Sequence, residues 1–416
     1  MLIFAPATLC QILARKYKEL GIRKKIYLNT IEAAPLITDS NIEYCHLMTL
    51  QDCEDFVVQK KIELAVVLTI ALTNEGLVNF FKYNLNLPVI GVTKEWMELE
   101  SSKLFGKKFM QKYNIKTPDY IELKELEDID RAIRKFGLPL VIKDDGLCAG
   151  LGTHTCNSKE NCIQIFENII NKNRKCLAER YIQREEITLH LVWDGKKITP
   201  LEPVRDYKRL KDYNEGINTG SMGCYCPVKL SNEQLKLIAD YVEKLNNIFQ
   251  EIKPDFKGIF VSGLIFTENS LYTLEFNMRP GLPEFDVLTI HLQNNIFDLF
   301  YKIEQSNFSK NDLIYKKGIT GCVNAVYKDY ELYTDNPQNK IISLDRNDLL
   351  LYKDNLYINT FINEFSENNK AIINPHNPVL SIIKNDINNP FEDIYQYLTK
   401  LGNKDLYYRK DIGKIS

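Results

Sequence analysis

The sequence lacks the features of several classes of protein. None of its ten cysteines forms a CxxC pair, and Cys224 and Cys226, two positions apart, fit neither a zinc knuckle nor a redox motif. The five histidines are far apart and form no metal signature. No run of 18 or more apolar residues is present, which excludes a transmembrane helix, and no basic segment precedes the apolar start. We therefore expect a cytoplasmic protein with reduced thiols and with neither a zinc site nor a signal peptide.

An excess of charge of either sign is also absent. The 53 basic and 55 acidic side chains give a net charge of −2, so there is no electrostatic case for binding a nucleic acid or an acidic membrane. With 416 residues, 44% of them hydrophobic and 26% charged, the chain is typical of a globular protein with about two to four domains. We expect its partners to be small molecules, and the protein to be a monomer or a homodimer.

The first 92 residues alternate between short apolar runs and amphipathic stretches. Strands are predicted at 2–5, 25–29, 64–69 and 88–92, and helices at 8–20 and 73–85. This order predicts an α/β domain with a parallel sheet, to which we assign residues 1–98. Its turns carry no GxGxxG, so no nucleotide site is expected in this domain.

From residue 93 the pattern is mixed. Helices are predicted at 93–113, 124–136, 158–171 and 231–250, with Lys103, Lys107 and Lys108 about one turn apart on the first of them. Strands are predicted at 139–143, 176–181, 187–193, 258–267, 271–277 and 318–327. Residues 204–228 are predicted to be one long loop, and the chain after 305 is weakly patterned.

A glycine-rich loop follows the strand that carries Lys143. In "VIKDDGLCAGLG", Gly146, Gly150 and Gly152 let the backbone approach a ligand, and an ammonium group with free N–H groups suits a phosphate. A surface turn with an exposed lysine explains the same residues, since short glycine motifs have many false positives.

A second group of polar residues ends the strand "SLYTLEFN". Glu275 and Asn277 are two apart on a strand and so face the same side, where a carboxylate and an amide oxygen can share Mg²⁺. Arg279 lies on that side if the strand continues, and can hold an anion. A polar strand end at a turn is the alternative.

Two further segments carry candidate groups. The long segment 203–225 contains Asp206, Lys208, Arg209 and Asp212, followed by "NTGSMG" with Asn218; long ordered loops are often functional, although a mobile surface loop is the alternative. In "LAERYIQREEITLHLVWDG", the strand-end residue Glu179 and the pair Glu185 and Glu186 can hold ribose hydroxyls, or form only a polar turn.

The order of these groups resembles that of the ATP-grasp ligases, and specifically of the phosphoribosylamine–glycine ligases. "VIKDDGLCAGLG" is similar to that family's "VVKADGLAAGKG", "RDYKRLKDYNEGINTGSMGCY" to "QDHKRxxDxDxGPNTGGMGAY", and "LEFNMRPGLPE" to "LEFNxRFGDPE". The terminal "YYRKDIG" also resembles the family's "RKDIG". The resemblance spans nearly the whole chain in the right order. It implies an α/β protein in which the 1–98 domain precedes an ATP-grasp domain at 99–315, with a lid at about 118–185, and a small C-terminal domain at 316–416.

The resemblance also implies roles for individual residues. Lys107 and Lys143 would hold the nucleotide phosphates, with Gly146, Gly150 and Gly152 covering them. Glu179 would begin the adenine hinge that includes Tyr181, and Glu186 would hold the ribose. Glu275 and Asn277 would bind Mg²⁺ or Mn²⁺. The carboxylate substrate and the acyl phosphate would be held by Arg279 and by the 206–223 segment, with Asp206, Lys208, Arg209 and Asn218. The reaction would use ATP to join a carboxylate to an amine, with release of ADP and phosphate.

The departures from the family are grouped. Leu151 replaces the loop lysine of "AGKG", and Leu282 replaces the aspartate of "GDPE". The N-terminal "GSGGRE" becomes "APATLC", with Leu9 and Cys10 in the places of Arg and Glu. "GPEAP" becomes roughly "LTIAL" (68–72), and "GGR" becomes "PHN" (375–377). In the family the N-terminal motifs face phosphoribosylamine, and apolar side chains there remove donors that a phosphate needs.

Three hypotheses follow. In the first, the chain is a carboxylate–amine ligase that uses an amine other than phosphoribosylamine. In the second, it is a diverged phosphoribosylamine–glycine ligase of purine synthesis. In the third, suggested by Leu151 and Leu282, it is a non-catalytic protein that binds ATP.

Overall fold

A parallel sheet forms the N-terminal part of the computed structural model, which describes residues 1–416 except 31–36, 38, 71, 149–151, 185, 334–338, 346–355, 361, 366–369, 376 and 415–416. The strand order is β3(Ile42–Cys45), β2(Ile26–Asn29), β1(Leu2–Phe4), β4(Ala65–Val67), β5(Val89–Ile90). The helices of this part are α1(Ala7–Glu19), α2(Leu50–Lys60), α3(Leu77–Asn79) and the π-helix η1(Phe80–Asn84). Leu2 and Phe4 pack into one buried cluster and Ile3 into another, so both faces of the sheet are covered.

The four strands predicted in this part are present, whereas two elements were missed. β3 is short and half polar, and its sequence "IEYC" gives little periodic signal. α2 begins with a capping box between Thr49 and Asp52, and only two of its side chains, Cys53 and Val57, are buried. The helix predicted at 73–85 is restricted to α3 and η1.

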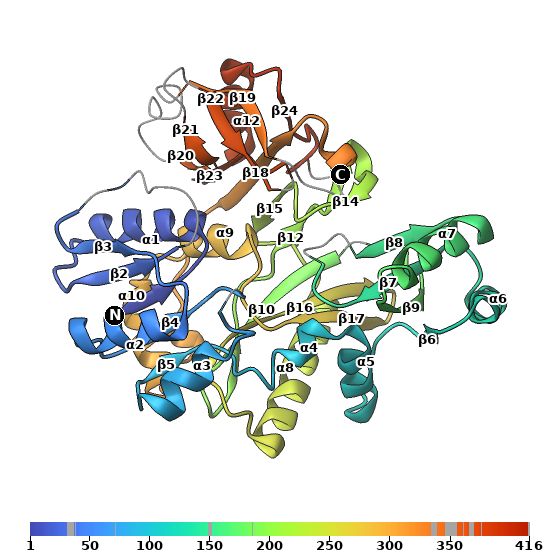
Figure 1. The fold of residues 1–416 in the computed structure, drawn as a ribbon, viewed down its shortest axis with the longest axis horizontal. Helices are drawn as coiled ribbons and strands as arrows, with labels where there is room; N and C mark the ends of the chain where they lie inside the picture. Colours follow the sequence, from blue (N-terminus) through green and yellow to red (C-terminus); the bar gives the residue numbers. More distant parts are fainter. Residues whose placement is uncertain are drawn as a thin grey trace.

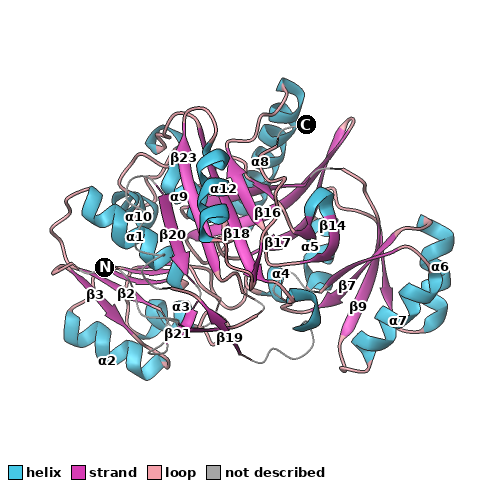
Figure 2. Cartoon of the chain, turned by 90° about the horizontal axis from the view of Figure 1, so that it is seen from above, coloured by secondary structure: helices cyan, strands magenta, loops and turns pink. Residues whose placement is uncertain are grey.

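Two antiparallel sheets follow, each of four strands (Figure 1). The central sheet has the order β11(Ile198–Pro200), β10(Glu186–Trp193), β16(Gly258–Thr267), β17(Ser270–Asn277), with α8(Asn232–Ile252) packed against it. The lid sheet has the order β6(Tyr120–Leu123), β9(Lys175–Arg180), β7(Leu140–Asp145), β8(Thr153–Cys156), and is covered by α6(Leu126–Phe136) and α7(Lys159–Ile170). In Figures 1 and 2 this lid projects from one side of the molecule.

The helix predicted at 93–113 is two helices, which corrects that prediction. α4(Glu98–Ser101) ends at Ser102, whose backbone is extended, and α5(Lys103–Lys112) begins there. The Ser102 hydroxyl accepts a hydrogen bond from the N–H of Phe105 at 3.1 Å. A serine N-cap therefore divides a segment whose apolar periodicity is continuous.

The loop predicted at 204–228 is also wrong, because it contains four short strands. β12(Arg205–Asp206) and β15(Gly223–Cys226) join a six-stranded sheet with β18(Ile319–Tyr327), β23(Leu380–Asp386), β20(Leu356–Thr360) and β24(Leu406–Tyr407). Between them, β13(Arg209–Lys211), the 3₁₀ turn η2(Asp212–Asn214) and β14(Glu215–Asn218) form a hairpin. Since β15 pairs with β18, about a hundred residues later in the chain, local periodicity could not reveal it.

The remaining elements complete the core. α9(Glu284–His291) packs against α1, β15 and β18, and α10(Ile296–Glu304) follows it. α12(Pro390–Leu401) covers the six-stranded sheet. The smaller elements are the sheet β19(Lys340–Ser343), β22(Lys370–Ile373), β21(Ile362–Phe365) and the 3₁₀ turns η3(Lys310–Asp312) and η4(Tyr330–Tyr333). The domain boundaries at 98/99 and 315/316 stay predictions.

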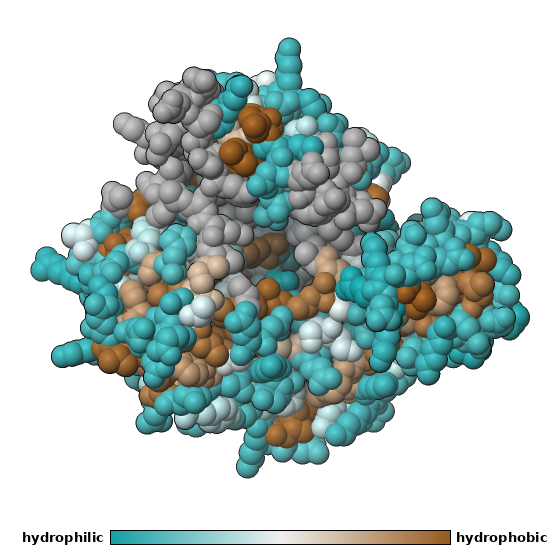
Figure 3. All heavy atoms as spheres, in the orientation of Figure 1, coloured by the Kyte–Doolittle hydropathy of each residue, from teal (hydrophilic) through white to brown (hydrophobic). Residues whose placement is uncertain are grey.

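The described residues contain no helix that could span a membrane, and the cysteines form no disulfide. None of the helices in the described ranges is long and apolar enough to cross a membrane. Figure 3 shows a face dominated by hydrophilic residues, with hydrophobic ones in several separate patches, one of them on the projecting lid. All ten cysteines are unbridged, and all but Cys148 are buried.

Candidate active site

One cavity of about 1160 Å³ lies where the lid, the central sheet and the six-stranded sheet meet. Every residue to which the resemblance assigns a role, and that the structure describes, lines it, although these residues come from one helix, seven strands and the loops beside them; Asp212 does not line it. The lining residues with an assigned role are Lys107, Lys143, Gly146, Gly152, Glu179, Tyr181, Glu186, Asp206, Lys208, Arg209, Asn218, Glu275, Asn277 and Arg279. Gly150, Leu151 and Glu185 lie outside the described residues. The roles assigned to these residues stay predictions.

A buried carboxylate joins the two predicted phosphate-binding lysines. Glu179 Oε1 lies 2.9 Å from Lys107 Nζ and 3.0 Å from Lys143 Nζ. In the lid, β7 pairs with β9 so that Val141 is opposite Glu179, which puts Lys143, two residues further, on the same face. Lys107 reaches this point from α5, and its Nζ also donates to Thr117 Oγ1 at 2.6 Å. Nothing in the sequence pattern indicated that Glu179 pairs with both lysines.

Burial lowers the pKa of both lysines, but the neighbouring acids oppose it to different extents. It lowers the pKa of Lys107 to about 8, against the opposing effect of Glu179. For Lys143 burial is the largest single effect, but Glu179, Glu275 and Glu186 together outweigh it and raise its pKa. A nucleotide phosphate entering the cavity would therefore meet one lysine that is firmly charged and one that is close to neutral at mildly alkaline pH.

The glycine-rich loop is held from both sides. Lys103 Nζ donates to the carbonyl of Gly146 at 2.7 Å. Gly146 has φ +151°, and a Cβ added there would lie 2.6 Å from the Arg174 guanidinium. Arg174 is in turn fixed by Asp144 at 2.8 Å and by the sulfur of Cys148 at 3.0 Å. Lys103 and Arg174 were not among the predicted site residues; the only signal in the sequence was that Lys103 stands one helical turn before Lys107.

The pair predicted to bind a metal faces the cavity from the end of β17. Burial raises the pKa of Glu275, but Lys208, Lys143 and Lys103 outweigh that effect and lower it to about 2, so the side chain is an anion. The neighbouring amide of Asn277 also lowers the pKa of Glu275. In the described ranges no group of three His, Cys, Asp or Glu side chains forms a metal site. A carboxylate and an amide oxygen on the wall of this cavity suit Mg²⁺, which takes few protein ligands and can complete its octahedron with phosphate oxygens and water.

The condition under which Arg279 would face the same side as Glu275 and Asn277, a strand that continues to residue 279, is not met. β17 ends at Asn277, and the Arg279 side chain pairs with Glu100 of α4. The Arg279 Nε to Glu100 Oε1 distance is 3.1 Å, while Glu100 Oε2 accepts the N–H of Met278 at 2.7 Å. The helix α4 thus fixes the turn that follows the strand, a role for Glu100 that the sequence did not indicate.

The hairpin β13–β14 connects the C-terminal part to the lid. Arg209 Nη2 donates to Thr155 Oγ1 at 2.7 Å, and Asn218 Nδ2 donates to the carbonyl of Thr153 at 3.0 Å. Both acceptors are on the lid strand β8. Lys208 points the other way, with its Nζ 3.4 Å from Glu186 Oε2 and 3.9 Å from Glu275 Oε1. It therefore lies between the residues predicted for the ribose and for the metal.

Several positions that depart from the family pattern also line the cavity. They are Pro6, Leu68, Ile70, Leu282 and Asn377. Leu9 and Cys10 are buried in the N-terminal core and do not line the cavity. His376 lies outside the described residues. Apolar side chains at these positions supply no hydrogen-bond donors to a bound anion.

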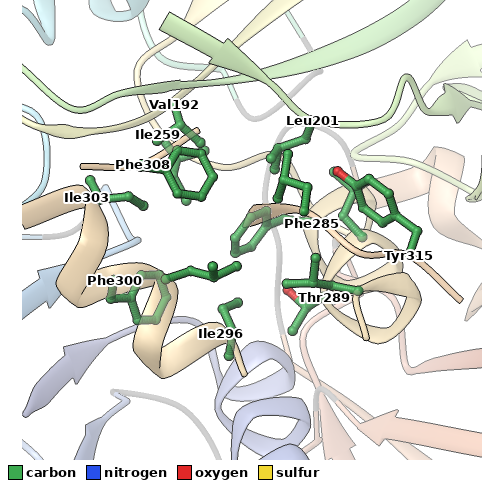
Figure 4. Close-up of a pocket in the computed structure, with 14 residues that line it drawn as sticks. Val192, Leu201, Ile259, Phe285, Thr289, Ile296, Phe300, Ile303, Phe308 and Tyr315 are labelled. Atoms are coloured by element: carbon green, nitrogen blue, oxygen red, sulfur yellow. The ribbon is translucent and has the colours of Figure 1, made fainter. Parts of the chain in front are cut away.

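A second, much smaller cavity is not a binding site. It holds about 30 Å³ between α9, α10 and the central sheet, and Figure 4 shows apolar side chains such as Phe285, Phe300 and Phe308 pointing toward it. A space of that size lined by apolar groups is a packing void, too small for a metabolite.

Comparisons with known proteins agree on one relationship. The family described as phosphoribosylglycinamide synthetase, ATP-grasp (A) domain, matches residues 101–285. The phosphoribosylamine–glycine ligase of Clostridium acetobutylicum is 33% identical over 300 residues, which cover 70% of this chain and 72% of that protein. The corresponding protein of Fusobacterium nucleatum is 27% identical over 385 residues, covering 90% of this chain and 89% of its own.

Solved structures confirm the predicted ATP-grasp fold. The crystal structure of a phosphoribosylamine–glycine ligase from Thermotoga maritima superposes with a TM-score of 0.76 at 22% identity, over 99% of both chains. The biotin carboxylase domain of a Hydrogenobacter thermophilus 2-oxoglutarate carboxylase, crystallised with MgADP, superposes with a TM-score of 0.67 at 17% identity, over 96% of this chain and 89% of that one.

Proposed function

The chain belongs to the phosphoribosylamine–glycine ligase family of ATP-grasp, ADP-forming carbon–nitrogen ligases, and from this premise we propose that its amine substrate is not phosphoribosylamine. One contrast carries the proposal. Most of the residues expected to hold ATP and magnesium line the cavity, among them Lys143, Glu275 and Asn277, although Leu151 replaces the family's loop lysine. By contrast, Pro6, Leu68 and Leu282 stand where a phosphate-bearing amine needs donors.

The nucleotide would lie between the lid and the central sheet. Lys107 and Lys143 would exchange their shared partner Glu179 for phosphate oxygens, or share it with them. Tyr181 would contribute to the adenine hinge, and Glu186 would hold the ribose. Glu275 and Asn277 would hold a magnesium ion, which neutralises charge on the phosphates. Gly146 and Gly152 would let the loop backbone close over them.

The chemistry needs positioning more than covalent help from the protein. ATP transfers its terminal phosphoryl group to a carboxylate, which gives ADP and an acyl phosphate. The amine nitrogen then attacks the acyl carbon, the bond to phosphate breaks, and an amide forms with loss of a proton. Lys208 and Arg279 are the cations beside the place where this charge develops, so we assign them to the acyl phosphate and the carboxylate.

Two other functions are supported less well. Identity of 33% to a phosphoribosylamine–glycine ligase favours that activity as the alternative. Glu275, Lys208 and Arg279, which the resemblance assigns to the metal, the acyl phosphate and the carboxylate, all line the described cavity, and this supports a ligase over a protein that only binds ATP.

The test is release of ADP by the purified protein with Mg-ATP and glycine, with and without freshly generated phosphoribosylamine. We expect no acceleration by phosphoribosylamine, and turnover with another acid and amine that Glu275→Ala abolishes. Strong dependence on phosphoribosylamine would show that the diverged purine enzyme is the right description. ATP binding without turnover across a panel of acids and amines would favour the non-catalytic alternative.

A further inference from the structure

Three carboxylates line the end of the cavity next to the N-terminal sheet. Asp206 comes from β12, and Glu284 and Asp286 come from the first turn of α9. Glu284 is 6% exposed and Asp286 1%. The charge of Glu284 raises the pKa of both Asp206 and Asp286, so the three carboxyl groups form one cluster.

Lys208 and Arg279 act electrostatically on the cluster but form no ion pair with it in the described part of the chain. None of the three is in an ion pair there. The nearby cations are engaged elsewhere, Lys208 with Glu186 and Glu275, and Arg279 with Glu100. Neither carboxylate oxygen of Asp286 has a hydrogen-bond partner at normal geometry, and neither has Glu284 Oε2. Asp206 accepts a hydrogen bond from Ser221 Oγ at 2.6 Å.

This arrangement is unfavourable without a ligand. Burial raises the pKa of Asp286 well above its ordinary value, Glu284 adds to the effect, and the Thr8 hydroxyl opposes it in part. Burial likewise raises the pKa of Asp206 to about 8, again helped by Glu284. Buried polar groups are normally hydrogen-bonded, and unpaired buried carboxylates are rare outside sites that bind something. A cation in the cavity would offset both the burial and the mutual repulsion.

The surroundings disfavour a phosphate. Thr8 lies in the first turn of α1, a place where a helix would attract an anion, but Asp286 already brings a carboxyl group to it. Leu68 and Leu282 supply no donors. Arg205 lines the same cavity, with its guanidinium over the Tyr207 ring at 5.5 Å from the ring centre.

A metal ion is also disfavoured. Magnesium or zinc at the acids would require three ligand groups in reach of one point, and no such group forms in the described ranges. An organic ammonium ion makes weaker geometric demands, because its N–H donors can reach carboxylates that are several ångströms apart.

Resting on the proposed ligase function, we propose that this end of the cavity binds the amine substrate as a small organic cation that carries no phosphate. Asp286 and Glu284 accept hydrogen bonds from its ammonium group, Asp206 is the third carboxyl group of the site, and Pro6, Leu68 and Leu282 contact its carbon skeleton. This assigns a chemical class to the amine whose identity the departures from the family pattern leave open.

The test uses the full chain with Mg-ADP bound and four probes: putrescine, ethanolamine, O-phosphoethanolamine and ethylene glycol. Titration calorimetry measures their binding without any turnover. We expect putrescine and ethanolamine to bind, the phosphate ester to bind at least about tenfold more weakly than ethanolamine, and the glycol not to bind. Asp286→Asn should weaken binding of the cations about tenfold or more, the usual cost of losing one hydrogen bond to a charged group.

Two further variants keep the test decisive. Glu284→Gln should have the same effect as Asp286→Asn, and Asp240→Asn, an exposed acid on α8, should have none. Retained Mg-ADP binding shows that a variant is folded. Tighter binding of the phosphate ester, cation binding that ignores both cavity variants, or no cation binding at all would each overturn the inference. Failure of the proposed ligase function would instead be seen as lack of ADP release, which this binding experiment does not require.

Discussion

At the scale of single residues, Glu179 is the group on which the nucleotide half of the cavity depends. It is 2% exposed and is the shared partner of two buried ammonium groups. Without the Glu179 carboxylate, both buried ammonium groups would lack a counter-ion in a low-dielectric interior. The resulting loss of stability is larger than that from breaking an exposed ion pair.

Replacing Glu179 by glutamine should lower the free energy of unfolding by about 3–5 kcal/mol. Mg-ATP should recover part of the loss, because its phosphates would pair with Lys107 and Lys143. Urea unfolding with and without Mg-ATP measures both effects. The matched control is Glu122→Gln on β6 of the same sheet, where the partner Lys124 is exposed and 3.8 Å away, and a change of about 0.5 kcal/mol or less is expected. Equal losses in the two variants would contradict the role assigned to Glu179.

The lowered pKa of Lys107 leads to a prediction of how nucleotide binding depends on pH. Its folded pKa of about 8 lies below the ordinary 10.5, so the folded protein loses this proton first as pH rises. Between these values the unfolded chain binds more protons, and the contribution of Lys107 to stability rises with pH. The affinity for ATP should depend on pH in the opposite direction, because a phosphate favours the ammonium form of Lys107. Affinity should therefore fall above about pH 8, and binding should take up a proton.

Calorimetry in two buffers of different ionisation enthalpy measures that uptake. Lys107→Arg keeps its charge at all these pH values, so the uptake should vanish in this variant. Identical uptake in the wild type and in Lys107→Arg would exclude Lys107 as its source.

At the scale of elements, the C-terminal tail holds the hairpin β13–β14. Arg409 is fully buried and donates to both oxygens of Asp411, to the carbonyl of Arg209 at 3.1 Å and to Asn214 Oδ1 at 3.0 Å. Asp411 also accepts the N–H of Tyr213 at 2.9 Å. The tail therefore fixes the strand from which Lys208 and Arg209 reach the cavity and the lid.

Arg409→Ala should release this hairpin. We expect faster hydrogen exchange over residues 205–226, a lower turnover rate, and a loss of stability of about 3 kcal/mol, the scale of lost hydrogen bonds to charged groups. Lys410→Ala is the control, because Lys410 contributes only its backbone N–H, to Asp212 Oδ1 at 2.7 Å, and its side chain is exposed. If exchange in α6 of the lid rose as much as in the hairpin, the effect would be global unfolding rather than release of this element.

The elements also show where prediction from the sequence succeeded. The strands β7, β16 and β17 and the helices α6, α7 and α8 lie close to their predicted ranges, because each has a strong local period. The predictions failed where a helix cap, or pairing with a strand distant in the sequence, determines the secondary structure. Ser102 divides the helix at 93–113, and β12 and β15 exist only because β15 pairs with β18.

At the scale of the whole molecule, three sheets and the N-terminal strands enclose one cavity. The ionisation of the groups that line it therefore affects the stability of the whole protein. Asp206 has a folded pKa of about 8 against an ordinary 3.8. A raised carboxyl pKa means that its contribution to stability is complete below about pH 4 and is lost as pH rises to about 8.

The melting temperature of the ligand-free wild type should therefore fall over this pH range more steeply than that of Asp206→Asn, which cannot ionise. A thermal-unfolding series at several pH values, on both proteins, makes the comparison. Parallel curves would show that Asp206 is ionised in the folded protein throughout, and that neither burial nor repulsion by Glu284 raises its pKa.

The sequence by itself determined the order of the chemistry-bearing groups, the parallel N-terminal sheet, and the positions at which the family pattern is broken, because these depend on residue type and local period. Only the tertiary structure decided which groups share a partner. Glu179 joins two lysines from α5 and β7, Glu100 holds Arg279, and three acids from β12 and α9 line one cavity without an ion pair in the described part of the chain. These encounters arise from packing between segments far apart in the chain, where burial strengthens each charge interaction, and no local pattern encodes them.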